Sequence, residues 1–155
     1  MARTMHHKER QLPAEETQAL LSRGKEGILA VNGDEGYPYA VPVNYIYMDD
    51  AIYIHTAPYG YKMESVTKNS KVCFTAIISS EIIEADTTTK YESVIAVGDA
   101  AVISDTAQKR KIMEAIVQRL APSNVSGGLQ TIEKLLSSVG IIRIDITELT
   151  GKAYR

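Results

Sequence analysis

The alternation of apolar and polar positions is clearest between residues 27 and 62, where it predicts three successive strands and a turn. Residues 27–31 form a short apolar run that ends in a cluster of turn residues. Residues 37–48 are rich in aromatic and β-branched side chains, and two aspartates then supply a tight turn. Residues 51–57 return as a partner strand. This region therefore predicts a meander of antiparallel strands.

The return strand and the turn after it contain the first candidate chemistry. Along residues 51–57, Ile52 and Ile54 alternate with Tyr53 and His55, so the two pairs face opposite sides of a sheet. The turn ends at Lys62, where a helix-like segment begins. A lysine and free backbone N–H groups at a helix start can hold a phosphate. A solvated lysine is the alternative interpretation.

The rest of the chain predicts alternating helices and strands. Helical spacing of apolar residues indicates helices at residues 12–24, 104–121 and 129–139, while residues 63–70 form a short helix or a pair of turns. Further strands are expected at residues 71–78, 90–103 and 142–147, with residues 79–89 as a loop and residues 149–152 as a tail. Gly98 lies inside a predicted strand and indicates a bulge or bend, as found where a sheet curls.

These elements predict a mainly β fold, a β-barrel with peripheral helices. About six strands are joined mostly as hairpins, which implies antiparallel pairing, and the helices must cover the barrel ends or one face. A length of 155 residues indicates a single domain over residues 1–155, with the polar residues 1–11 as an N-terminal arm. The arm is expected to be solvated or to cross to another subunit.

Charge and composition narrow the function. A formal net charge of −2 argues against a nucleic-acid binder that depends on a general basic field. The sequence shows neither a membrane span nor a signal peptide, so we expect a cytoplasmic protein without a membrane partner. Nine tyrosines against one phenylalanine and no tryptophan suggest that several tyrosines line a pocket or an interface.

Three other features of the sequence have ordinary explanations. His6 and His7 are adjacent, but two histidines without a third ligand give little support for a metal, and we predict none. Cys73 has no partner for an internal disulfide and is expected to be a small buried apolar residue rather than a reactive thiol. His55, judged by itself, is expected to be a hydrogen-bonded structural histidine rather than a catalyst.

Five segments in a fixed order give the sequence a family resemblance. They are GILAVNGDEGYPYAVPVNYIYMDDAIYIHTA, YGYK, NSKVCF, TTTKYESVIAVGDAAVI and ITELTGKA. Together they resemble the pyridoxamine 5′-phosphate oxidase-like split-barrel flavoproteins, and most closely their nitroimidazole-resistance branch. The resemblance covers nearly all of the chain after about residue 10. It implies a six-stranded antiparallel split barrel that forms a homodimer and binds FMN at the dimer interface.

The resemblance also implies which residues bind the flavin. One segment would lie beside the isoalloxazine ring, a strand end and the following turn would hold the ribityl phosphate with Lys62 as the cation, and a third segment would come from the other subunit. In that order the implied residues are Pro42, Val43, Asn44 and Tyr45; His55, Thr56, Ala57, Tyr61, Lys62 and Met63; and Tyr91, Glu92, Ser93 and Val94.

One position departs from the family pattern. Many relatives have a histidine immediately before the phosphate lysine, where this chain has Tyr61. A tyrosine can stack or donate a hydrogen bond, but its usual pKa of about 10 makes it a poor base at neutral pH. Any role of a histidine at this position is therefore in doubt, and no catalytic residue is assigned.

Two functions on this scaffold are compatible with the sequence. The first is an FMN-dependent oxidoreductase in which electrons pass from a reduced nicotinamide to a small acceptor such as a nitroaromatic or nitroimidazole-like compound. The second is a non-catalytic protein that holds flavin or haem, since fold does not fix function. Pyridoxamine phosphate oxidase activity is a weaker third idea, because the chain is short and lacks a convincing second set of basic residues.

Overall fold

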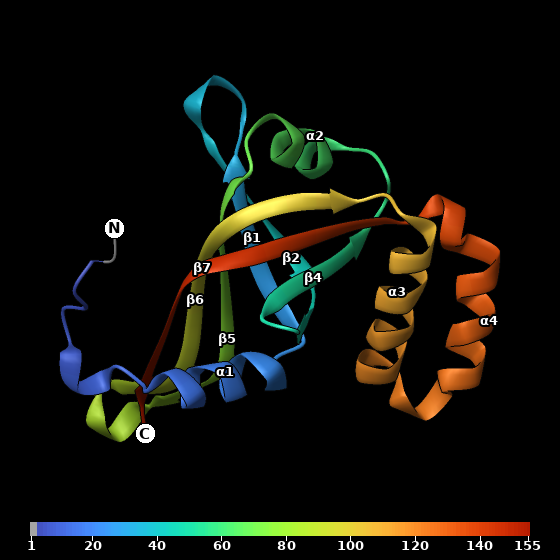
Figure 1. Ribbon diagram of the computed structural model, residues 1–155. Helices are drawn as coiled ribbons and strands as arrows, with labels where there is room; N and C mark the ends of the chain where they lie inside the picture. The colour runs from blue at the N-terminus through green and yellow to red at the C-terminus, as the bar shows by residue number, and fades with distance from the viewer. Residues whose placement is uncertain (1–2) are drawn as a thin grey trace.

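The computed structural model describes residues 3–155, which form one curled antiparallel sheet with helices at its ends and on one side (Figure 1). The helices are α1 (Ala14–Arg23), α2 (Tyr61–Lys68), α3 (Thr106–Leu120) and α4 (Val125–Leu135). The strands are β1 (Glu26–Asn32), β2 (Pro38–Asn44), β3 (Ile46–Met48), β4 (Ala51–Thr56), β5 (Lys71–Ile83), β6 (Thr88–Ile103) and β7 (Gly140–Tyr154).

The strand order is β2-β1-β5-β6-β7-β4-β3, and every neighbouring pair is antiparallel. The predicted mainly β fold with peripheral helices is confirmed. The sheet curls without closing, as in a split barrel, and within residues 3–155 its two edge strands are β2 and β3. Strand β2 nevertheless comes within contact distance of β4 across the opening.

The structure has seven strands where the sequence predicted six, because residues 37–48 do not form one strand. Tyr45 interrupts them: its backbone N–H donates to the carbonyl of Lys25 at 3.0 Å, and its side chain turns into the core. β2 therefore ends at Asn44 and pairs with β1, whereas β3 pairs with β4 at the opposite edge of the sheet. The Gly98 bulge is confirmed, since the register between β6 and β7 shifts at Val97/Gly98.

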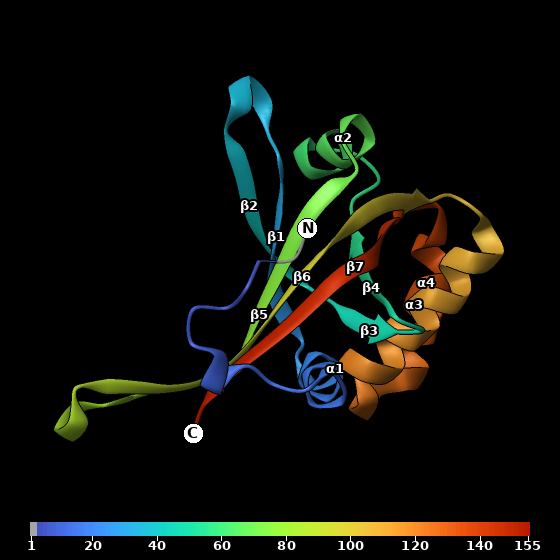
Figure 2. The same ribbon diagram turned by 60° about the vertical axis from the view of Figure 1, so that its left-hand side comes forward.

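The prediction of a loop at residues 79–89 was wrong. β5 continues to Ile83 and pairs with the first residues of β6, so that the two strands form a long hairpin that projects from the body (Figure 2). A single 3₁₀ turn at Glu84–Asp86 and the left-handed Thr87 close it. Residues 149–152 are likewise part of β7 rather than a tail, and α4 begins at Val125, four residues before the helix predicted from residue 129.

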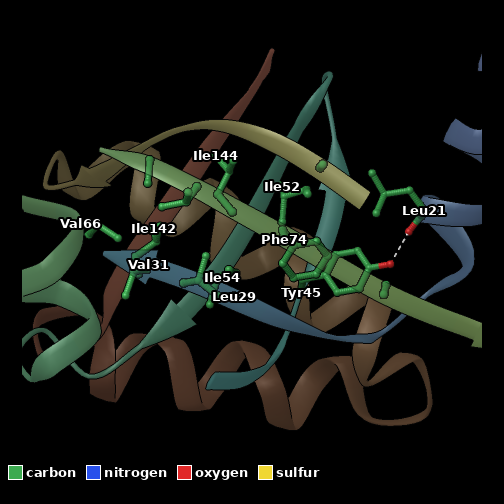
Figure 3. Packing of buried hydrophobic residues seen from close by; sticks show 14 of the residues in the cluster. Leu21, Leu29, Val31, Tyr45, Ile52, Ile54, Val66, Phe74, Ile142 and Ile144 are labelled. Carbon is green, nitrogen blue, oxygen red and sulfur yellow. Dashed lines mark hydrogen bonds between the residues drawn. The ribbon is translucent and has the colours of Figure 1, made fainter. Parts of the chain in front are cut away.

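The main core fills the inside of the curled sheet (Figure 3). Ile52 and Ile54 of β4 point into it, as their alternation predicted, and both are fully buried. Two helices close its ends: α1 contributes Leu20 and Leu21, and α2 contributes Val66. Burial of such side chains stabilises the fold by about 1.5–3 kcal/mol each.

A second apolar cluster attaches α3 to the other side of β3, β4 and β7. Ile112 and Ile116 of α3 pack there against Tyr53 and Ile141. Asp105 caps the helix by accepting the Gln108 N–H at 2.9 Å, and aspartate is a favoured residue at this position. α4 then runs back beside α3, so the two helices form a hairpin on one side of the sheet (Figure 1).

The N-terminal segment runs along the sheet's own last strand. Gln11 bridges to Lys152 of β7, and the Leu12 N–H donates to the carbonyl of Gly151 at 2.9 Å. Met1 and Ala2 of the predicted arm lie outside the described residues. Over residues 3–155 no helix combines the length and the hydropathy needed to cross a bilayer.

Candidate functional site

The loop between β4 and α2 is held in place by glycines at its two ends. Thr56, the last residue of β4, pairs with Gly140. A Cβ at Gly140 would lie 2.8 Å from the Ala57 carbonyl oxygen and 3.0 Å from Pro58 Cα, so only glycine allows the loop to pass this closely. Gly60 has φ 109° and ψ 175°, a conformation reserved for glycine. The chain enters α2 directly from it.

Lys62 lies in the first turn of α2, beside backbone donors without partners in the helix. The first bond of the helix is the Glu64 N–H to the Gly60 carbonyl, which leaves the earlier N–H groups free, and no side chain caps them. Lys62 is half-buried and forms no ion pair within residues 3–155. A cation and unpaired N–H groups at a helix start fit a phosphate group.

Tyr61 is bound to a neighbouring hairpin rather than pointing toward Lys62. Its hydroxyl accepts the Asp34 N–H at 2.6 Å, and its ring lies 4.6 Å from that of Tyr39. The turn between β1 and β2 is thereby fastened to α2. Met63, next in the helix, is buried in the core and offers only its backbone to a ligand.

The segment predicted to lie beside a flavin ring follows the edge strand β2 (Figure 1). Pro42 and Asn44 are exposed, while Val43 packs against the core. Asn44 donates its side-chain amide to the Lys25 carbonyl at 3.3 Å. Because β2 has no strand on its outer side within residues 3–155, its backbone is open to a ligand there.

Tyr45 is a core residue. Its ring packs edge-on against Phe74 with 4.8 Å between centroids, and its hydroxyl donates to the Leu21 carbonyl at 2.7 Å (Figure 3). Burial raises the pKa of Tyr45 to about 12. Only the main chain of Tyr45 is therefore placed to meet a ligand.

His55 lies on the side of β4 opposite to Ile54, facing α3. A hollow of about 440 Å³ brings it together with Asn44 of β2 and Met113 of α3. His55 is exposed, and within residues 3–155 its imidazole forms no hydrogen bond, which contradicts the expectation of a hydrogen-bonded structural histidine. Burial of one side of the ring lowers the pKa of His55.

The third predicted segment lies far from the others in the same chain. Tyr91, Glu92 and Ser93 are at the base of the projecting hairpin, at the opposite end of the sheet from α2 (Figures 1 and 2). Val94 points into the core and is buried. One chain therefore assembles β2, the end of β4 and α2, but does not bring residues 91–94 to Lys62.

Glu92 belongs to an ion-pair network at that end. It accepts hydrogen bonds from Arg155, from Arg23 of α1 and from Ser79. The Arg155 guanidinium holds the pKa of the Glu92 carboxyl below its usual value. Tyr91 stands beside the ammonium group of Lys152, which lies 5.8 Å from the ring centroid.

The outer face of the sheet is a feature that the sequence analysis missed. Ile28, Ile95 and Val97 lie on central strands, yet each exposes more than a third of its surface. Cys73, which was expected to be buried, is half-buried on this face between β1 and β6, and burial raises the pKa of its thiol. Alternation along each strand could have indicated this face, but the order of the strands was needed to join its residues.

The described residues contain no group of three side chains that could hold a metal ion. His7 instead donates from Nδ1 to the Glu9 carboxylate at 2.9 Å, and its ring lies edge-on to that of His6 with 4.8 Å between centroids.

Comparison with known proteins gives one family match and several structural likenesses. The family model described as pyridoxamine 5′-phosphate oxidase matches residues 13–153. No curated protein matches the sequence.

Three solved structures illustrate the likeness in fold. A candidate 5-nitroimidazole antibiotic resistance protein from Bacteroides thetaiotaomicron is 20% identical over 97% of this chain and 95% of its own, with a TM-score of 0.72. A FAD-binding protein from Mesorhizobium loti is 22% identical over 94% and 98%, with a TM-score of 0.70. A FAD- and haem-binding protein from Mycobacterium smegmatis is 18% identical over 94% and 74%, with a TM-score of 0.77.

Proposed function

The chain belongs to the pyridoxamine 5′-phosphate oxidase family, and on this premise we propose that it binds a flavin, FMN, in the opening between β2 and β4. The observation that carries the proposal is Lys62, a half-buried cation without an ion-pair partner in residues 3–155, in the uncapped first turn of α2. That arrangement suits the terminal phosphate of FMN. The proteins from M. loti and M. smegmatis, which share the fold, bind FAD and so support a flavin more generally.

The remaining contacts of the proposed site come from backbone and small side chains. The open edge of β2 at Pro42 and Asn44 offers carbonyl and amide groups to the flat edge of a flavin ring, and Thr56 lies at the end of the facing strand β4. Hydrogen bonds of this kind orient a flavin and tune its potential, while the flavin supplies the electron transfer when bound.

A second copy of the chain would complete the site. The exposed apolar side chains Ile28, Ile95 and Val97 form a continuous outer face on the central strands, which is unusual for a surface left in water. We propose a homodimer that buries this face and brings residues 91–93 of one subunit toward Lys62 of the other. Within one chain, residues 91–93 lie at the base of the β5–β6 hairpin, and this hairpin is at the opposite end of the sheet from α2 (Figures 1 and 2), which supports this arrangement.

The proposed reaction is a flavin-dependent oxidation and reduction in which electrons pass from a reduced nicotinamide to a small acceptor, such as a nitroaromatic compound. This chain's part is to bind and orient, because the site holds no histidine beside Lys62 and the Tyr61 hydroxyl is engaged by Asp34. Because the Tyr61 hydroxyl is bound to the Asp34 N–H instead of facing a substrate, a second candidate function is also favoured, in which the protein binds flavin without turnover. Nicotinamide oxidation by flavin-loaded protein with an added nitroaromatic acceptor discriminates between the two.

The test of flavin binding is the absorption spectrum of the purified protein, with the flavin identified after denaturation. We expect Lys62→Ala to weaken FMN binding by at least about tenfold, since charge-assisted hydrogen bonds contribute about 1.5–3 kcal/mol. Lys68→Ala is the matched control, because Lys68 lies at the exposed end of the same helix and only approaches Asp34 at 3.9 Å. Equal FMN affinity in both variants, or protein that neither carries nor takes up flavin, would refute the proposal.

A further inference from the structure

The hairpin of α3 and α4 encloses a pocket that lies apart from Lys62. The pocket measures about 350 Å³, within the range of ligand-binding cavities. Met113 and Val117 of α3 form one wall, Ile132 and Leu135 of α4 form another, and His55 reaches it from β4. Close packing of the two helices depends on Gly128, where a Cβ would lie 2.4 Å from Val117 Cγ1. We call this cavity the α3–α4 pocket.

Three polar side chains line the α3–α4 pocket, His55, Thr131 and Ser138, and His55 is the only one with an aromatic ring. No lysine, arginine, aspartate or glutamate lines it. Thr131 lines it as well, but its hydroxyl donates to the Gly127 carbonyl at 3.0 Å. His55 is exposed and its ring forms no hydrogen bond within residues 3–155, so its nitrogens are available to a ligand.

We propose that the α3–α4 pocket binds a small uncharged aromatic molecule whose one polar group forms a hydrogen bond with His55. A mostly apolar wall with a small number of polar groups is the usual composition of a site that binds a small molecule. The Met113 thioether and the imidazole both make favourable contacts with a flat ring. A phosphate or carboxylate is excluded, because it would lose its hydration without meeting a cation.

This inference goes beyond the proposed flavin site and does not depend on it. The phosphate end of that site is at Lys62, which does not line the α3–α4 pocket. His55 is common to the pocket and to the hollow that contains Asn44, so the two regions adjoin at β4. The test is therefore made on the full chain both without flavin and with added FMN, and a failure of FMN to bind leaves the pocket measurable.

The experiment follows indole and indene by ¹H–¹⁵N NMR titration. The two molecules have nearly the same shape, but only indole carries an N–H donor. We expect saturable shifts in β4, α3 and α4, with indole bound about fivefold more tightly than indene, the effect of one neutral hydrogen bond. In His55→Phe this preference should disappear while indene still binds.

A pair of variants on α4 tests the location. Thr131 and Gln130 are neighbouring exposed residues, but only Thr131 lines the pocket. We expect Thr131→Phe to lower indole affinity at least about tenfold by filling the cavity, and Gln130→Phe to leave it within about twofold. Circular dichroism of both variants checks that they fold. Unsaturable binding, shifts outside these elements, equal effects of the two variants, or an indole preference that survives in His55→Phe would each overturn the proposal.

Discussion

At the scale of single residues, the Tyr61 side chain stabilises the fold and does not face the proposed ligand site. Its hydroxyl accepts the Asp34 N–H and its ring packs on Tyr39, so that α2 is tied to the turn between β1 and β2. A Cβ at Gly33 would lie 2.6 Å from the same hydroxyl, which shows how closely the turn approaches. The sequence identified Tyr61 as a departure from its relatives but could not reveal this partner.

Removing the Tyr61 hydroxyl should destabilise the protein modestly. In Tyr61→Phe the Asp34 N–H loses its acceptor, although solvent can replace part of the bond, so we expect the free energy of unfolding to fall by about 0.5–1 kcal/mol. Urea denaturation measures it. Tyr59→Phe is the control, since Tyr59 is 77% exposed and its hydroxyl makes no hydrogen bond in residues 3–155. Equal stability of Tyr61→Phe and the wild type would contradict this role.

At the scale of elements, the position of α2 depends on the backbone of Gly60. The residue combines φ 109° with ψ 175°, and the helix starts immediately after it. A Cβ added there would meet no atom within 4 Å. Any cost of a side chain at Gly60 is therefore conformational rather than steric.

We expect Gly60→Ala to lower the free energy of unfolding by about 1–3 kcal/mol, because an L-residue must leave or strain this conformation. The matched control is d-alanine at the same position, introduced by chemical ligation, for which these dihedral angles are ordinary extended backbone. It should cost nothing and can stabilise by about 0.4–1 kcal/mol through the unfolded state. Chemical denaturation of the two proteins gives the comparison. Equal losses from both would point to crowding instead of backbone strain.

The elements themselves were partly predictable from residue patterns. Alternation identified β4 and the first half of β7, and the helical spacing of apolar residues identified α3, because local side-chain contacts decide these cases. Polar composition misled at residues 79–89, where threonine and glutamate side chains lie on a hairpin exposed on both faces. Composition cannot distinguish such a hairpin from a loop, since neither buries an apolar face.

Only those parts of the candidate site that are continuous in the sequence could be predicted. The turn from Thr56 to Lys62 is continuous in sequence, and glycine and helix-start signals mark it. The orientation of the His55 side chain toward α3 could not be predicted. Helix α3 lies more than fifty residues later in the sequence, and its position against β4 follows from the strand order. Tyr45 illustrates the same limit: only the packing against Phe74 shows that its side chain belongs to the core.

At the scale of the whole molecule, helices cover only part of the outer face of the sheet. The α3–α4 hairpin covers β3, β4 and part of β7 on one side, whereas the outer face of β1, β5 and β6 has no helix (Figure 1). A hollow between that face and residues 3–5 shows that the N-terminal segment stands over Ile95 and Val97 without filling the space. This is the surface on which we propose that a second subunit packs.

A charge on the outer face should separate the subunits. Ile95 is 46% exposed on β6, and Ile95→Asp would bury a carboxylate in the proposed dimer while costing the single subunit little. We expect light scattering to report a dimer for the wild type and a monomer for the variant, with loss of bound flavin. Val102→Asp is the control, because Val102 is 40% exposed farther along β6 and next to α3. A wild-type monomer with tightly bound flavin would contradict the dimer.

The composition of the edge strand β2 also affects how readily the protein aggregates at high concentration. A sheet that ends in unpaired backbone groups can recruit strands from other chains and grow into aggregates. Proline occupies two of the seven positions of β2, Pro38 and Pro42, and each lacks the amide hydrogen that a docking strand would need. The edge that stays open to a small ligand is thus a poor template for fibril-like growth.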